Sequence, residues 1–120
     1  MAFLENNKLT RAKAKEMCLK NNVMIGTNFS LSNATERGDT FANTIPIKKL
    51  SQDFWLLLND QYNNELHIFK VPANSIPINE MYQLSDKPSI FIKIYCNDEN
   101  FQDDLSVIRF DSWLVKTIKY

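Results

Sequence analysis

The segment from Asp53 to Pro72, DFWLLLNDQYNNELHIFKVP, constrains the fold more than any other part of the chain. It opens with an unbroken apolar run, Phe54 to Leu58, and a cluster of Asn, Asp and Gln residues typical of a turn follows. Apolar residues then resume in near-alternation at Leu66, Ile68 and Val71. Two β-rich runs separated by turn residues predict a hairpin. Because the first run is apolar on both faces, we expect a central strand covered on two sides.

The remaining elements are predicted from periodicity and from residue preferences. Alternation of apolar and polar residues predicts further strands over 23–32, 40–47 and 90–95. Good helix formers predict a helix over 10–20, capped by Thr10 and ended by two Asn residues. A short helix is expected over 79–84, and an i, i+4 apolar stripe predicts a last helix that begins at Asp111.

These elements predict one domain of class α/β, or α+β, over residues 1–120. We expect a mixed sheet of about five strands, centred on 53–59, with helices at the N- and C-termini. Pro46 marks the end or the edge position of the strand over 40–47. Residues 1–7 are interpreted as a short leader whose Phe3 and Leu4 pack against the core, and Trp55 and Trp113 are interpreted as core residues.

The formal net charge is zero, but the charges are unevenly distributed. Residues 1–50 contain eight Lys and Arg against four Asp and Glu, whereas residues 51–120 contain six against ten. A basic half can bind phosphates and an acidic half can bind a basic partner. A solvated surface without a partner is the simpler interpretation of the same asymmetry.

Several classes of site and of location are disfavoured by the residues present. Cys18 and Cys96 are too few for a disulfide framework or a zinc site, and His67 is the single histidine. His67, Asp60 and Glu65 surround the hairpin turn, where we expect exposed charge rather than a metal site. No apolar run approaches the ~20 residues that span a bilayer, and the N-terminus lacks a signal-peptide core. We therefore expect a cytoplasmic protein with reduced thiols and no membrane partner.

The order of elements and several short motifs resemble a known family. After the strand that follows Thr27 come KKLSQ, DFWLLL, ELHIFKVPANSI and FDSWL. This series resembles the back half of PD-(D/E)XK restriction-endonuclease-like domains. In that family a D-[FY]-[FW] strand, and a strand closing on I-P or V-P, follow the catalytic strand. The resemblance extends from Thr27 to Tyr120 and implies a nuclease-like scaffold.

The catalytic motif of that family is absent from this chain. A restriction-type site uses carboxylates on adjacent strands to hold Mg²⁺ and a nearby Lys to orient water. Where the family's E-x-K would fall, the chain has Asn28-Phe29-Ser30, which supplies neither a metal ligand charge nor a cation. The resemblance therefore implies a non-catalytic binding protein on a degraded nuclease-like scaffold, without a metal or cofactor.

Two kinds of partner are compatible with such a scaffold. For DNA, we expect contacts with the phosphate backbone from Arg11, Lys13, Lys15, Lys20, Arg37, Lys48 and Lys49. A DNA-binding protein is the other partner: the chain would act as a phage- or plasmid-borne inhibitor of a restriction or CRISPR-type defence nuclease. An acidic patch would then imitate phosphates through Asp98, Glu99, Asp103 and Asp104. A solvated loop is the simpler interpretation of those four residues.

An enzymatic alternative also stays open. A Mg²⁺-dependent DNA endonuclease with a migrated active site would use Glu36, Asp39 and a lysine. A solvated loop is again the simpler interpretation of Glu36 and Asp39. A third possibility is a subunit role in a larger assembly.

Overall fold

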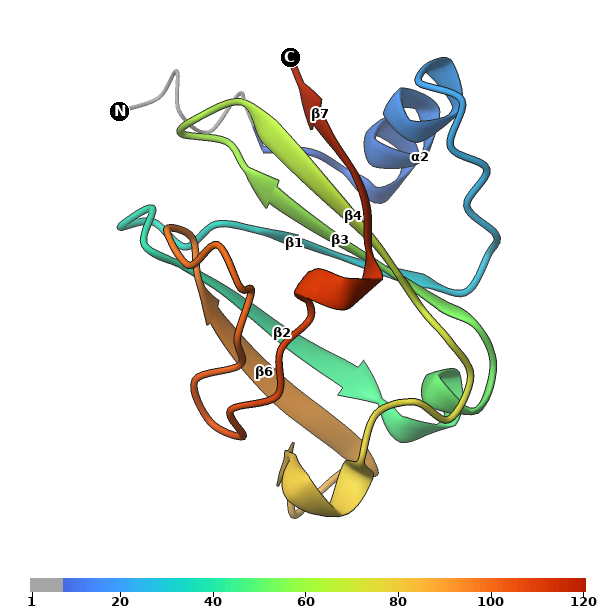
Figure 1. The fold of residues 1–120 in the computed structure, drawn as a ribbon, viewed down its shortest axis with the longest axis vertical. Coiled ribbons are helices and arrows are strands. Elements are labelled where there is room, and N and C mark those ends of the chain that lie inside the picture. The colour runs from blue at the N-terminus through green and yellow to red at the C-terminus, as the bar shows by residue number, and fades with distance from the viewer. Residues whose placement is uncertain (1–7) are drawn as a thin grey trace.

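The computed structural model describes residues 8–120 and consists of two β-sheets and one α-helix (Figure 1). The predicted leader over 1–7 lies outside the described residues. The helix is α2 (Arg11–Lys20), and the strands are β1 (Phe29–Asn33), β2 (Thr40–Pro46), β3 (Phe54–Asp60), β4 (Glu65–Val71), β5 (Tyr82–Gln83), β6 (Ser89–Tyr95) and β7 (Leu114–Lys119). Short 3₁₀ helices are η1 (Ile47–Ser51), η2 (Ile78–Glu80) and η3 (Asp111–Trp113).

The predicted hairpin forms the middle of a mixed four-stranded sheet with the order β1-β3-β4-β7. β3 and β4 pair antiparallel, so that Leu57 lies opposite Ile68, and β1 pairs parallel with β3. The predicted central strand is confirmed, because Leu56, Leu57 and Leu58 are all fully buried. Burial on both faces explains why this run is apolar without alternation.

Successive residues of β3 pack into two separate cores. Leu56 and Leu58 face the three-stranded sheet, which has the order β2-β6-β5, whereas Leu57 faces α2. Figure 1 shows α2 on one side of the four-stranded sheet and β2 and β6 on the other. Of the α2 residues, Ala14 and Cys18 are the buried ones, so the helix packs through a narrow face and exposes its basic side.

The ends of α2 follow the sequence prediction. The hydroxyl oxygen of Thr10 accepts a hydrogen bond from the Lys13 N–H at 3.1 Å, which satisfies one of the free donors of the first turn. Asn21 ends the helix, and Asn22 adopts the left-handed conformation with φ of 63°. Within residues 8–120, no helix is long and apolar enough to cross a bilayer.

Two parts of the predicted architecture are wrong. The expected mixed sheet is present with four strands, but the other three strands form a second sheet, because β2 pairs with β6 and not with the hairpin. The expected C-terminal helix is the strand β7, and Asp111 begins only the short η3. The β-branched residues Val115, Thr117 and Ile118 suit a strand that pairs with β4.

Two further boundaries differ from the prediction. The strand expected over 23–32 is β1, Phe29–Asn33, because Val23 and Ile25 are buried against α2 without joining a ladder. The helix expected over 79–84 is η2 followed by β5, in which Tyr82 pairs with Phe91 of β6. Other expectations are confirmed: β2 and β6 occupy the predicted segments, and Pro46 is the last residue of β2.

Candidate nucleic-acid interface

Three cationic side chains gather at the start of β1. The Arg11 guanidinium donates a hydrogen bond to the backbone carbonyl of Phe29 at 2.9 Å. The Lys49 ammonium donates to the same carbonyl oxygen at 3.4 Å. Lys48 is adjacent in η1 and is exposed. Arg11, Lys48 and Lys49 form what we call the basic cluster.

Separate elements hold these side chains in place. Arg11 is the first residue of α2, directly after the Thr10 cap. Lys49 lies in η1, where its backbone carbonyl accepts a hydrogen bond from the Asn28 side-chain amide at 2.8 Å. The same amide donates to the carbonyl of Asp53 at 2.9 Å. Asn28 directly precedes β1, so these two hydrogen bonds hold the η1 segment against the start of that strand.

The charge of the basic cluster is not neutralised by a carboxylate of the described residues. The ion pairs among residues 8–120 lie elsewhere and join Lys20 to Glu16, Arg109 to Asp111 and Lys119 to Glu65. Asp53, the acidic residue nearest to Lys49 in sequence, accepts a hydrogen bond from the Ala73 N–H at 3.0 Å. Burial, and then the positive charges of Arg11 and Lys48, lower the pKa of Lys49. A group under such repulsion is stabilised by a bound anion.

Aromatic rings lie beside these cations. Phe29 of β1 pairs with Trp55 of β3, which pairs with Lys70 of β4, so the three residues stand in one row across the sheet. The Arg11 guanidinium lies 3.9 Å from the centroid of the Phe29 ring. The Lys70 ammonium lies 5.6 Å from the centroid of a Trp55 ring. Both are cation–π arrangements. We call Phe29, Trp55 and Lys70 the aromatic row.

The structure divides the seven candidate DNA contacts into three groups. Arg11, Lys48 and Lys49 come together, while Lys13, Lys15 and Lys20 extend the positive charge along the exposed side of α2. Lys20 is paired with Glu16 at 3.0 Å. Arg37 lies in the loop after the other end of β1, so the length of that strand separates it from the basic cluster.

Sequence reasoning missed Lys70 and the partial exposure of Trp55. Trp55 was interpreted as a core residue, and it packs against the core under α2, but it stays partly exposed. The signal that could have revealed the pairing of Trp55 with Lys70 is the number of residues on each side of the hairpin turn. Counting outward from the turn places Trp55 opposite Lys70.

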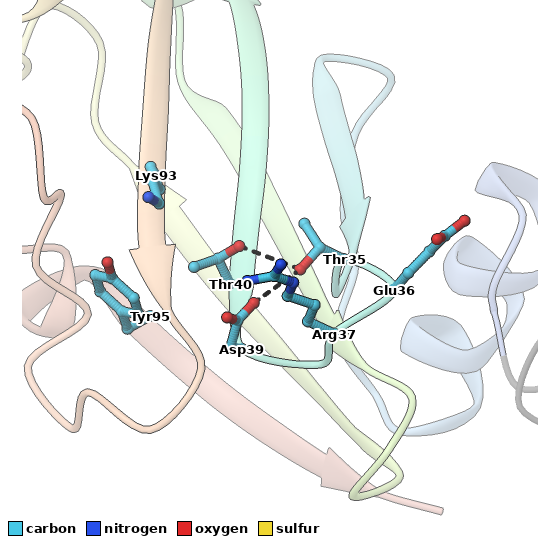
Figure 2. A pocket seen from close by; sticks show the side chains of 7 residues that line it. All are labelled: Thr35, Glu36, Arg37, Asp39, Thr40, Lys93 and Tyr95. Carbon is cyan, nitrogen blue, oxygen red and sulfur yellow. Dashed lines mark hydrogen bonds between the residues drawn. The ribbon is translucent and has the colours of Figure 1, made fainter.

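The alternative catalytic residues line a pocket of about 550 Å³ formed by the β1–β2 loop and β6 (Figure 2). Its lining residues are Thr35, Glu36, Arg37, Asp39, Thr40, Lys93 and Tyr95. Figure 2 shows the Glu36 side chain directed away from Asp39. The Asp39 carboxylate instead accepts a hydrogen bond from the Thr35 hydroxyl at 3.1 Å. Among the described residues, no group of three or more His, Cys, Asp or Glu side chains is placed to hold a metal ion.

The four candidate acidic contacts have different environments. Asp98 and Glu99 line a second pocket, of about 430 Å³, together with Glu65 and His67. Asp104 is exposed, whereas Asp103 is fully buried. The Asp103 carboxylate accepts hydrogen bonds from the Lys93 N–H at 2.9 Å and from the Ser106 hydroxyl at 2.6 Å. It joins the loop after β6 to that strand and is not presented at the surface.

The polar residues around the hairpin turn are less exposed than expected. Asp60 and His67 are buried, and Asp60 accepts hydrogen bonds from the backbone N–H groups of Tyr62 and Asn63 at 3.2 and 3.3 Å. His67 Nδ1 lies 2.9 Å from the Thr117 hydroxyl oxygen. Burial lowers the pKa of His67, and the carboxylates of Glu65 and Asp60 oppose that shift. Both residues therefore belong to the folded framework.

Comparison with known proteins finds no matching family model, no matching curated protein and no matching solved structure. The chemistry of the surface follows from its groups. A guanidinium and an ammonium that reach one point from two elements can hold a phosphate oxygen between them through charge-assisted hydrogen bonds.

Proposed function

We propose that this protein is a non-catalytic nucleic-acid-binding protein that holds the phosphate backbone of DNA on its basic cluster. One observation carries the proposal: Arg11 and Lys49 converge on the Phe29 carbonyl, and no described carboxylate neutralises them. Backbone phosphates supply the negative charge that such a cluster lacks, and their counterions are released on binding.

A nucleic acid suits the basic cluster better than an isolated anion does, because further cationic side chains lie next to the cluster. Lys13 and Lys15 follow Arg11 along the exposed side of α2, and Lys48 follows in η1. A polymer with regularly spaced phosphates contacts several of these groups at once. The positive end of the α2 dipole, at Arg11, adds to the attraction.

The resemblance to PD-(D/E)XK domains enters the proposal as its scaffold. At the positions where the family's catalytic motif would fall, Asn28 holds Lys49, and Phe29 accepts hydrogen bonds from Arg11 and Lys49. If this segment corresponds to the family's catalytic strand, cations lie beside it in place of a metal-binding carboxylate, which supports binding without a cofactor. A cytoplasmic location is part of the proposal, and two free cysteines, Cys18 and Cys96, support it.

A second candidate function is binding to a DNA-binding protein such as a defence nuclease. It is favoured by the three carboxylates that line the second pocket, those of Glu65, Asp98 and Glu99. Such a surface attracts the basic groove of a nuclease. Co-purification with a nuclease that Asp98→Asn and Glu99→Gln abolish would favour this candidate over DNA.

The DNA-binding proposal is tested by fluorescence anisotropy with labelled DNA over a salt series. We expect affinity to fall steeply between about 50 and about 200 mM salt. The variant Arg11→Gln/Lys49→Gln should reduce the salt slope by about 2, since each lost phosphate contact contributes about 0.9. Lys87→Gln/Lys119→Gln is the matched control, because it removes the same charge elsewhere. Absence of binding to any DNA at low salt, or equal loss in both double variants, would overturn the proposal.

The endonuclease alternative has a separate test. Supercoiled plasmid is incubated with the protein and Mg²⁺, and with the protein and EDTA. Cutting that requires Mg²⁺ and that disappears in Glu36→Ala/Asp39→Ala would replace the binding proposal with catalysis. Cutting that persists in this variant would exclude Glu36 and Asp39 as its site.

A further inference from the structure

The exposure of residues on the α2-facing side of the sheet changes along β3. Leu57 of β3 and its partner Ile68 of β4 are fully buried beneath α2. Two residues earlier in β3, Trp55 points to the same face but is only partly buried, and its partner Lys70 is exposed. The helix therefore covers the middle of this face together with Phe29, which is buried, and leaves Trp55 and Lys70 at its margin.

The two tryptophans of the chain differ in their surroundings. The Trp113 ring lies 5.3 Å, edge-on, from Phe110, which is fully buried in the core between the two sheets. The Trp55 ring has a lysine ammonium over it instead. Lysine side chains are flexible and strongly hydrated, so a planar base can displace the Lys70 ammonium from this ring.

A cation lies at each end of the pair of rings formed by Phe29 and Trp55. Arg11 stacks on Phe29 at one end, and Lys70 stands at the other. Because neighbouring strands lie about 4.8 Å apart, the row spans about 10 Å. That width corresponds to about three steps of a stacked nucleic-acid strand. Within the row, Trp55 is the partly exposed ring, and an aromatic ring flanked by cations is a usual means of binding an unpaired base together with its phosphates.

We propose that the aromatic row makes this surface a binding site for single-stranded nucleic acid, with one base stacked on Trp55. The basic cluster holds the phosphates on one side of that base, and Lys70 moves from the ring to a phosphate on the other. This inference rests on the proposed function and adds that the bound nucleic acid is single-stranded. A duplex hides the faces of its bases within its own stack, so it contacts the cations but not the Trp55 ring.

The first test compares a single-stranded oligonucleotide with a duplex of the same sequence by anisotropy at one salt concentration. We expect the single strand to bind at least about tenfold more tightly, a preference that Trp55→Leu abolishes and Trp55→Phe partly retains. Trp113→Phe is the control and should leave the preference unchanged. Equal affinities for both forms, or a preference that survives Trp55→Leu, would overturn the inference.

The second test observes Trp55 directly and does not depend on the folding of a Trp55 variant. In Trp113→Phe the single remaining tryptophan is Trp55, and a stacked base should quench its fluorescence. Quenching by the single strand but not by the duplex supports the inference, and binding of the single strand without quenching contradicts it. Duplex binding with no role for Trp55 would overturn only the inference, whereas no binding of either form would overturn the proposed function as well.

Discussion

The side-chain amide of Asn28 donates a hydrogen bond to the backbone carbonyl of Lys49 at 2.8 Å and a second to the carbonyl of Asp53 at 2.9 Å. One uncharged side chain thus fixes two points of the segment that joins β2 to β3. Lys48 and Lys49 lie in that segment, in η1. The position of two of the three cations in the basic cluster therefore depends on a residue that carries no charge.

Asn28→Ala should weaken DNA binding several-fold without removing a cation. The lost hydrogen bonds free η1, so Lys49 is no longer held beside Arg11, and stability should fall by about 1 to 3 kcal/mol. The salt dependence of binding should stay close to that of the wild type, whereas Lys49→Gln should lower the slope by about 1. Anisotropy over a salt series measures both quantities, and urea unfolding measures the stability.

Asn79→Ala is a suitable control for this change, since Asn79 is an exposed residue of η2. It should leave both affinity and stability within experimental error. Undiminished affinity in folded Asn28→Ala would show that the orientation of η1 does not matter for binding.

The pKa of Lys49 makes DNA binding dependent on pH in the alkaline range. Burial, Arg11 and Lys48 lower this pKa from its ordinary 10.5 in the free protein, and a bound phosphate raises it again. The complex therefore binds more protons than the free protein as Lys49 titrates. Affinity should consequently fall as pH rises through the lowered pKa.

Lys49→Arg provides the comparison, because arginine stays charged throughout that range. Affinity measured from neutral pH to pH 10 should decline less in this variant than in the wild type. Identical declines in the two proteins would place the titrating group elsewhere.

The part of the fold that could be predicted is the part fixed by neighbouring residues. The hairpin of β3 and β4 follows from an apolar run, a turn cluster and a second run that are contiguous in the sequence. The parallel pairing of Phe29 with Trp55 and the pairing of Phe41 with Ile94 join distant segments. Alternation indicates that a segment is a strand but does not select its partner, so one sheet was expected where there are two.

The candidate site shows the same limit. Lys48 and Lys49 could be named from charge alone, but their approach to Arg11 depends on β1 lying beside β3, which brings Asn28 to Asp53. The C-terminal helix was expected from spacing that suits a helix face equally well. Tertiary pairing with β4 determined the outcome and placed β7 at the edge of the sheet.

Asp103 should matter for stability rather than for partner binding. Asp103→Ala leaves the partly buried N–H of Lys93 and the hydroxyl of Ser106 without their acceptor and should destabilise the fold by about 3 kcal/mol. Asp104→Ala, an exposed neighbour, should change stability by no more than about 0.5 kcal/mol. Urea unfolding compares the two, and equal effects would contradict the structural role of Asp103.

His67 should make stability depend on pH near neutrality. The imidazole makes edge-on contacts with the rings of Phe41 and Phe101, whose centroids lie 6.2 and 5.0 Å away. Burial lowers the pKa of His67 from its ordinary 6.5, so the folded state favours the neutral ring. The unfolded chain takes up the proton first as pH falls. The stability present above about pH 6.5 should therefore decrease on acidification, until the folded pKa is passed.

One proton limits this slope to about 1.4 kcal/mol per pH unit. His67→Phe keeps an aromatic ring at the site but cannot titrate. Urea unfolding at pH 8, 6.5 and 5.5 should show a loss of stability in the wild type that is smaller in the variant. The carboxylates titrate in both proteins, so the difference between the two pH profiles isolates the imidazole. Parallel profiles would show that His67 is equally easy to protonate in the folded and unfolded states.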